Sequence, residues 1–498
     1  MTIKTVLFII AVIVFFSFKN KSSNKEVTEP PKYQANWESL KQHKTPDWFL
    51  DAKFGIYCHW GPYSVPAHKT EWYSHWMYEK DHPIRKYHEK TYGPLNEFGY
   101  KDFIPMFTAE KFNPEEWAEL FKKAGAKFAG PVTEHADGFA MWDSKLTKWN
   151  AAKMGPKRDV VGELAKAIRA NDMIFVATFH HQWKYSWYPT WDKKTDAFDP
   201  KYEDLYGPKV PPGIFAFSKE KTDPLPDKKF NDEWFAKVKE VVEAYHPDLM
   251  YFDSKMFILT EEVRKKMACH FYNHANKNDQ DVVLTYKQKD LAEGSAVLDL
   301  ERARMSEKKD FPWLTDDSID WGSWCHVSNP DYKSTNRLID FLVDVISKNG
   351  CVLLNVTPTA AGEIPQPVKE RLLEMGEWLK INGEAVYGTR PWKVFGEGPA
   401  KVVEGHLNER ENADNTEKDI RFTTKGNNLY AMVLDIPSED VLITSLGENA
   451  GLLEKQIKNI ELVGSKEKIE WEHMGEYLKI TKPKEETCNY CVVFRLTF

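Results

Sequence analysis

Acidic and imidazole side chains stand at the ends of five apolar runs in this sequence of 498 residues. Such groups bind or release protons near neutral pH, so together they suit general acid–base and nucleophilic catalysis. A single histidine at a strand end is often structural, and an aspartate there often caps the next helix. Five such ends favour a catalytic site. They are His59-Trp60-Gly61, Glu134-His135, His180-His181, Asp253 and Asp299-x-Glu301.

Asp253 and Glu301 are the carboxyl groups that best fit this chemistry. Asp253 follows the apolar run Leu249–Phe252, which places a charge at the mouth of a hydrophobic strand. Side chains alternate along a strand, so Asp299 and Glu301 share one face, and the leucine residues beside them point to the other. Two carboxyl groups on different strand ends suit a glycosidase, with a separation of about 5–5.5 Å for retention and a wider one for inversion.

Catalysis makes opposite demands on such a pair. The group that protonates the leaving oxygen needs a raised pKa, to which we expect the charge of Asp299 to contribute. The nucleophile must stay ionised, and we expect His59 or His135 to help. The alternative for Glu301 is a structural ion pair with one of the two arginine residues that follow it in the sequence.

Other classes of function lack their motifs here. The sequence has no glycine-rich phosphate loop after a strand, no Walker lysine, no G-x-S-x-G motif and no HExxH motif. Its histidines are spread over separate strands, so we expect neither a cofactor nor a catalytic metal. The net charge of −7 comes from well-mixed residues, which argues against nucleic acid as a partner. Aromatic residues make up 14% of the chain, which suits stacking on sugar rings.

Alternating strand-like and helix-like segments predict an α/β fold, a (β/α)₈ barrel in which some helices can be irregular or missing. An eighth strand is expected within Ile319–His326. The predicted helices are Pro114–Ala126, Val160–Ala170, Phe230–Tyr245, Glu261–Ala275, Thr335–Lys348 and Val368–Ile381. The seven predicted strands are Phe54–Gly61, Phe128–His135, Met173–His181, Asp248–Ser254, Val282–Lys287, Ala296–Arg302 and Cys351–Pro358.

The sequence pattern changes near residue 390. From there, short stretches of alternating apolar and polar residues, such as Asn428–Ile436, predict a C-terminal β-sandwich. We therefore expect a catalytic barrel over residues 26–390 and a sandwich over 391–498. The long polar excursion Lys184–Lys229 follows the third strand, so we expect it to form a lid or subsite wall.

The N-terminus has the layout of an export signal. Lys4 precedes the apolar run Val6–Phe16, and a polar stretch follows. We expect residues 1–25 to be a signal peptide, or alternatively an uncleaved anchor, and the protein to be periplasmic or extracellular. No later segment is apolar enough to span a bilayer. Six cysteines are few for a disulfide scaffold, and their spacing does not reveal any pairing.

With these residues in view, the chain resembles the α-L-fucosidases of glycoside hydrolase family twenty-nine. The matching blocks run in family order along nearly the whole predicted barrel. They are GIYCHWGPYSVP from Gly55, EWYSHWMY from Glu71, AGAKF from Ala124, DGFAMWDSKLTKWN from Asp137, MGPKRDVVGEL from Met154, PDLMYFDS from Pro247, PWLTDDSI from Pro312, LLNVTP from Leu353 and NGEAVYGTRPW from Asn382.

The resemblance implies a retaining mechanism with a covalent fucosyl-enzyme. It assigns the nucleophile to Asp253 and the general acid/base to Glu301, with Glu293 and Asp299 as the alternatives. No metal or cofactor is implied, and the partner is a fucosylated glycan. The residues that it implies for sugar binding are His59, Trp60, Glu71, Trp72, His135, His181, Lys287, Trp313 and Trp324.

Three departures from the family pattern leave the substrate preference open. Where many members carry His-His-Asp, this chain has His135-Ala136-Asp137. Where many carry Asn-Asp-Arg, it has Thr285-Tyr286-Lys287. The pattern Pro-Trp-Glu-Thr is replaced by Pro-Trp-Leu-Thr at Pro312–Thr315. Lysine lacks the planar fork of arginine. We expect exo-hydrolysis of terminal α-L-fucosides. The alternatives are hydrolysis of an α-L-galactoside or of a sulfated or otherwise modified fucoside, or fucose binding without catalysis.

Overall fold

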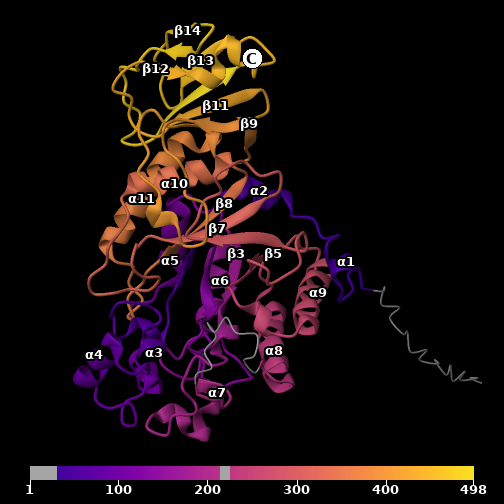
Figure 1. Ribbon diagram of the computed structural model, residues 1–498, viewed down its shortest axis with the longest axis vertical. Helices are drawn as coiled ribbons and strands as arrows, with labels where there is room; N and C mark the ends of the chain where they lie inside the picture. The colour runs from indigo at the N-terminus through magenta and orange to yellow at the C-terminus, as the bar shows by residue number, and fades with distance from the viewer. Residues whose placement is uncertain (1–30, 213–224) are drawn as a thin grey trace, which may run out of the picture. The chain divides into compact units, whose positions relative to one another are not determined.

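The computed structural model describes residues 31–212 and 225–498, and Tyr33–Phe498 form one compact unit. Eight parallel strands close into a barrel, in which each strand pairs with the next and β1 pairs with β8 (Figure 1). This confirms the predicted (β/α)₈-type fold. The barrel strands are β1 (Phe54–Cys58), β2 (Phe128–Glu134), β3 (Ile174–Phe179), β4 (Leu249–Phe252), β5 (Val283–Lys287), β6 (Val297–Glu301), β7 (Trp313–Ser318) and β8 (Gly350–Val356).

The seventh strand lies earlier in the sequence than expected. β7 pairs with β6 and β8, whereas Ile319–His326 is a loop, so the strand expected there is wrong. Two consecutive carboxylates, Asp316 and Asp317, interrupt the apolar pattern by which the other strands were recognised. Both are buried, and each lies near the ammonium of a buried lysine, Lys287 or Lys333. Ion pairing therefore satisfies groups that the sequence pattern suggested were exposed.

The helices that flank the barrel begin at polar caps. The side chains of Asn113, Asp159, Asp227, Thr260 and Ser334 each accept a hydrogen bond from the first turn of their helix. In the described chain, the β5–β6 and β6–β7 connections contain no α-helix, which fits the expectation of missing helices. The α-helices are α1 (Trp37–Leu40), α2 (Asp47–Ala52), α3 (Tyr73–Trp76), α4 (Pro83–Thr91), α5 (Pro114–Lys123), α6 (Val160–Ala170), α7 (Glu203–Tyr206), α8 (Lys228–Tyr245), α9 (Glu261–Lys277), α10 (Thr335–Ser347) and α11 (Gln366–Asn382).

The C-terminal strands form two antiparallel sheets, in the orders β13-β16-β11-β10-β9 and β12-β15-β14. Phe422 and Phe494 of the larger sheet and Ile443 and Leu478 of the smaller one belong to a single buried cluster, which confirms the sandwich. The strands are β9 (Arg390–Glu397), β10 (Ile420–Lys425), β11 (Asn428–Val433), β12 (Val441–Ile443), β13 (Asn459–Leu462), β14 (Trp471–His473), β15 (Leu478–Ile480) and β16 (Val492–Thr497).

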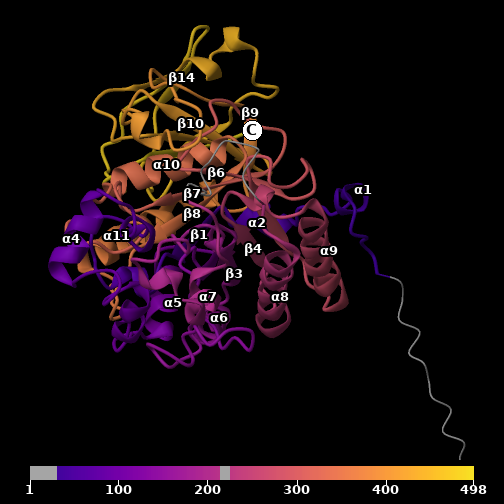
Figure 2. The ribbon, with the colours of Figure 1, turned by 60° about the horizontal axis from the view of Figure 1, so that its bottom comes forward.

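A buried ionic cluster joins the barrel to the larger C-terminal sheet. Helix α10 packs against β9 and β10, and it lies beside the C-terminal strands in both views (Figure 1 and Figure 2). Asp344 of α10 contacts the ammonium of Lys348 at 2.8 Å and the guanidinium of Arg421 of β10 at 2.6 Å. Burial alone would raise the pKa of Asp344, but the charges of Lys348, Arg421 and Arg304 lower it below its ordinary value.

The predicted signal at residues 1–25 lies outside the described residues. Within residues 31–212 and 225–498, none of the helices has the length and apolar character needed to cross a bilayer. All six cysteines are free thiols.

Candidate active site

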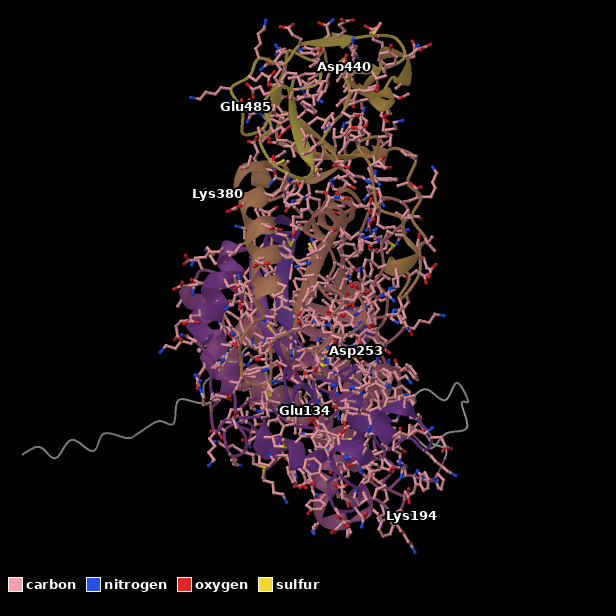
Figure 3. The ribbon with its side chains drawn as sticks, turned by 90° about the vertical axis from the view of Figure 1, so that its left-hand side faces the viewer. Glu134, Lys194, Asp253, Lys380, Asp440 and Glu485 are labelled. Atoms are coloured by element: carbon pink, nitrogen blue, oxygen red, sulfur yellow. The ribbon has the colours of Figure 1, made fainter. Side chains whose placement is uncertain are left out.

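A pocket of about 110 Å³ lies where the carboxyl ends of the barrel strands converge, as expected for this fold. Asp253 follows β4, and in Figure 3 it lies among the barrel side chains, apart from Asp440 of the C-terminal sheets. A larger cavity of about 340 Å³ lies near the β10–β11 turn, but its lining contains only one carboxyl side chain, Glu454. The smaller pocket is lined by His59, Glu71, Trp72, His135, His180, Trp183, Tyr251, Asp253, Ser254, Lys287, Glu301, Asp316, Trp324, His406 and Leu407.

Lys287, at the end of β5, is the central charge of this pocket. Its ammonium lies 3.0 Å from Oδ1 of Asp253 and 2.8 Å from Oε2 of Glu301. The same nitrogen is 3.3 Å from Asp316 and 3.6 Å from Asp299. Burial would lower the pKa of Lys287, but these four carboxyl groups raise it well above its ordinary value. The lysine is therefore a permanent cation at neutral pH.

The two pocket carboxyls differ in their proton affinity. Burial raises the pKa of Asp253, but the charge and hydrogen bond of Lys287 outweigh it, so the pKa falls below its usual value. For Glu301, burial and the charges of Asp253 and Asp316 outweigh Lys287 and raise the pKa to about 7. The side chains are 15% and 16% exposed, so both can meet a ligand. At neutral pH one is ionised and the other can donate a proton, which is the division of roles that acid-assisted displacement requires.

Asp299, whose charge we expected to act on Glu301, lies outside the pocket lining. It is 1% exposed, and burial followed by the charge of Asp316 raises its pKa well above the usual value. The charges that raise the pKa of Glu301 include those of Asp253 and Asp316. Asp316 is held in place by hydrogen bonds from the hydroxyls of Tyr57 (2.7 Å) and Tyr251 (3.0 Å).

Three histidines from successive strand ends form one wall of the pocket. Burial, followed by their mutual repulsion, holds the pKa of His59 and His180 well below the usual value, and burial lowers that of His135 to about 4. Neutral imidazoles can donate to and accept from sugar hydroxyls. His59 and His180 approach with their Nε2 atoms at 3.2 Å, and Asn355 accepts a hydrogen bond from Nδ1 of His59 at 2.9 Å. Among the described residues, these three histidines also have side chains close enough to one another to hold a metal ion.

Another part of the pocket lining combines a buried carboxylate with indole rings, of which Trp324 packs against His59 with ring centroids 5.2 Å apart. Glu71 accepts hydrogen bonds from the backbone N–H of Trp324 (3.0 Å) and from the hydroxyl of Thr70 (3.0 Å). Trp72, Trp183 and Trp324 also line the pocket. Flat apolar rings beside a carboxylate suit a ligand that has both a hydrophobic face and hydroxyl groups.

Comparison with known protein families shows to which family this chain belongs. A family model described as alpha-L-fucosidase matches residues 20–384, and one described as alpha-L-fucosidase C-terminal domain matches residues 412–497. The chain belongs to the α-L-fucosidase family. It is 32% identical to tissue alpha-L-fucosidase of Bos taurus over 434 residues, covering 84% of this chain and 81% of that protein. The corresponding protein of Homo sapiens is 31% identical and covers 87% of this chain and 85% of its own length.

Solved α-L-fucosidase structures share the fold. The crystal structure of Thermotoga maritima alpha-fucosidase in complex with fucose has a TM-score of 0.74 and 32% sequence identity, and the match covers 93% of this chain and 100% of that chain. The complex of the same enzyme with a mechanism-based inhibitor has a TM-score of 0.75 and 32% identity, with coverages of 94% and 100%. Family membership thus rests on both sequence and architecture.

Eight of the residues predicted from the resemblance to α-L-fucosidases meet in the pocket, and three lie outside its lining. Trp60 packs behind it and donates to the carbonyl of Thr359. His181 bonds the carbonyl of Trp234, and Trp313 starts β7 at the opposite end of the barrel. The eight in the pocket are Asp253, Glu301, His59, Glu71, Trp72, His135, Lys287 and Trp324.

The structure also shows where three other features predicted from the sequence lie. Glu293 is exposed and lies outside the pocket lining, while Glu134 forms a buried ion pair with Lys237 at 2.6 Å. From the excursion at residues 184–229, Trp187 packs against Trp72 with ring centroids 4.7 Å apart, and residues 213–224 lie outside the described chain. That indole therefore supports the pocket wall.

Seven residues of the pocket lining were not among those predicted to catalyse or to bind the sugar, although His180 was named among the strand-end residues. The position of His180 at a strand end was a usable signal, while Asp316 was hidden by the misplaced seventh strand. His406 and Leu407 come from beyond the barrel, so no strand-end pattern points to them. The seven are His180, Trp183, Tyr251, Ser254, Asp316, His406 and Leu407.

Proposed function

We propose that this protein is a retaining exo-α-L-fucosidase in which Asp253 is the nucleophile and Glu301 the general acid/base. The bridging of these two carboxyls by Lys287 carries the proposal. Because one ammonium nitrogen lies 3.0 Å from an oxygen of Asp253 and 2.8 Å from one of Glu301, the sum of these distances limits the separation of the two oxygens. Carboxyl groups that share one ammonium lie close together, which fits the separation of about 5–5.5 Å typical of retaining pairs better than the wider separation of inverting pairs and so supports retention.

The proposed reaction has two displacements. The Asp253 carboxylate forms a bond to the anomeric carbon while the glycosidic bond breaks, and Glu301 gives its proton to the departing oxygen. Glu301, now ionised, removes a proton from water as the water oxygen bonds to the same carbon and releases Asp253. The lowered pKa of Asp253 and the pKa of about 7 for Glu301 fit these roles.

The pocket dimensions favour release of a single terminal sugar. Its volume of about 110 Å³ and its buried histidine wall leave room for one deoxysugar ring rather than an internal chain segment. The indole of Trp324, stacked under the guanidinium of Arg302 at 4.5 Å, gives a fixed apolar surface for the methyl group of fucose.

Proton NMR of the first product formed from an aryl α-L-fucoside tests this function. We expect the α-anomer of fucose to appear first and to equilibrate later, and we expect a higher kcat/KM than for the matching α-L-galactoside. Initial release of the β-anomer would contradict retention, and preference for the galactoside would contradict the assigned sugar.

We also propose that residues 1–25 direct export, on the charge and hydropathy pattern of that segment. Fractionation of cells expressing the full chain tests this. Recovery of the protein only from the cytoplasm would contradict it.

A further inference from the structure

A segment from the C-terminal part of the chain returns to the mouth of the barrel. Between β9 and β10, the backbone N–H of Leu407 donates to the carbonyl of Glu301 at 2.9 Å. Two residues later, the N–H of Glu409 donates to the carbonyl of Arg302 at 2.8 Å. This short ladder attaches the segment directly to the end of β6, the strand that carries the proposed acid/base.

Buried ion pairs fix the segment in this position. The Glu409 carboxylate accepts hydrogen bonds from Nε of Arg304 at 2.8 Å and from Nη2 of Arg337 at 2.7 Å, and all three side chains are almost wholly buried. Charge-assisted hydrogen bonds in a dry environment hold their partners firmly. The backbone next to Glu409 is therefore part of the rigid pocket frame.

Two side chains of the segment face the pocket. His406 places Nε2 3.7 Å from Oε2 of Glu301, and Leu407 also contributes to the lining. Both remain accessible, with His406 37% and Leu407 52% exposed. Leu407 has a φ of 64°, a left-handed conformation that is unfavourable for a residue with a side chain. The ladder and the ion pairs maintain this conformation and keep an apolar side chain exposed at the rim.

We propose that His406 and Leu407 form the binding site for the leaving-group sugar, the ring to which the fucose is attached. This rests on the proposed function of Glu301. A general acid lies about 2.6–3.2 Å from the oxygen that it protonates, so the first atoms of the leaving group must lie beside the Glu301 carboxyl. Buried His59, His135 and His180 close the inner side of the pocket, which leaves the accessible His406 side for the outgoing sugar.

The chemistry of the two side chains fits a pyranose ring. Burial and the charge of Lys287 lower the pKa of His406, so its imidazole is neutral at neutral pH and can both donate to and accept from hydroxyls. The isobutyl group of Leu407 can cover the C–H face of the same ring. The leaving group we infer is thus a neutral hexose or N-acetylhexosamine, held through one apolar face and its hydroxyl edge.

Two substrates with the same fucosyl group separate this role from general damage. α-L-Fucosyl fluoride has a leaving group too small to reach the segment, whereas an α-L-fucosyl disaccharide places a second ring beside it. In His406→Ala and Leu407→Ala we expect kcat/KM on the disaccharide to fall at least tenfold more than on the fluoride. Leu442→Ala, which truncates an equally exposed leucine of β12, is the matched control and should alter both substrates alike.

A product ratio gives a readout that does not depend on the folded fraction. With fucosyl fluoride as donor and N-acetylglucosamine as acceptor, we expect both variants to lower the ratio of transfer to hydrolysis by several fold. Equal changes on the two substrates together with an unaltered ratio would overturn the proposal. Failure of the unmutated protein to turn over fucosyl fluoride would instead contradict the proposed function.

Discussion

The ammonium of Lys287 lies 3.0 Å from Oδ1 of Asp253, and burial leaves both groups little contact with water. The same nitrogen also faces Glu301, Asp299 and Asp316. One cation cannot neutralise four ionised carboxyls in a dry site, so protons must remain on part of the cluster. The pKa values of Asp299 and Glu301 are both raised above their usual values, so burial and the neighbouring carboxyls favour the protonated form of these two groups.

Lys287→Met should raise the pKa of Asp253, because the charge that favours the ionised form is lost. The nucleophile must be ionised, so the acidic limb of the kcat/KM profile should move to higher pH. We expect kcat/KM at pH 7 to fall roughly 100-fold, the scale of losing a preorganised electrostatic partner. Lys287→Arg restores the charge and should recover part of the loss. An unmoved acidic limb in Lys287→Met would contradict the role assigned to this lysine.

Glu301→Gln should remove the proton donor while keeping the shape of the side chain. General acid catalysis contributes about 10²–10⁴-fold, so hydrolysis of a disaccharide should fall by that factor, and that of fucosyl fluoride much less. In the unmutated protein, activity should decline as pH rises through about 7, because Glu301 then loses its proton. A disaccharide pH profile of the variant that keeps this decline would assign it to another group.

His180→Ala tests the histidine that was named at a strand end but was not among the residues predicted to bind the sugar. Losing one hydrogen bond to a sugar hydroxyl costs about 0.5–1.5 kcal/mol, which corresponds to up to a tenfold loss in kcat/KM. Because the ring lies 3.2 Å from His59, we also expect weaker binding of free fucose, measured by calorimetry. Trp313→Phe is the contrasting variant, since that indole lies at the other end of the barrel and bonds the carbonyl of Lys348. Equal affinity of His180→Ala and the unmutated protein for fucose would exclude a contact.

Asp344→Ala should destabilise the protein by about 3–5 kcal/mol, because it leaves the cations of Lys348 and Arg421 buried without their anion. The folded pKa of Asp344 is depressed, so its contribution is present above the unfolded pKa of about 3.9 and is lost as pH falls below it. Urea unfolding at pH 7 measures the loss. Asp440→Ala, which breaks a surface pair with Lys479, should leave the stability almost unchanged.

Polar residues that directly follow an apolar strand located the site, although two of them, Glu134 and His181, lie outside the pocket lining. Asp253 after β4 and His59 after β1 are such cases, and both line the pocket. The pattern is absent at β7, where Asp316 and Asp317 are buried by ion pairing with lysine residues outside that strand. Such compensation appears only when the chain is folded, so a pattern of hydropathy along the sequence misses it.

Two further errors have a similar origin. Trp313 lies at the start of β7. Its place in the family-like block from Pro312 does not show which end of the barrel it occupies. His406 reaches the pocket through a ladder between segments more than 100 residues apart, from Leu407 to Glu301. No periodicity within either segment encodes that contact.

Covalent trapping tests the central claim most directly. A 2-deoxy-2-fluoro-L-fucosyl fluoride should react with the protein once per chain, and peptide mass spectrometry should locate the fluorofucosyl ester on Asp253. Asp253→Gly should stay unlabelled. Label on a different carboxylate, or full turnover of an aryl α-L-fucoside by Asp253→Gly, would contradict the account.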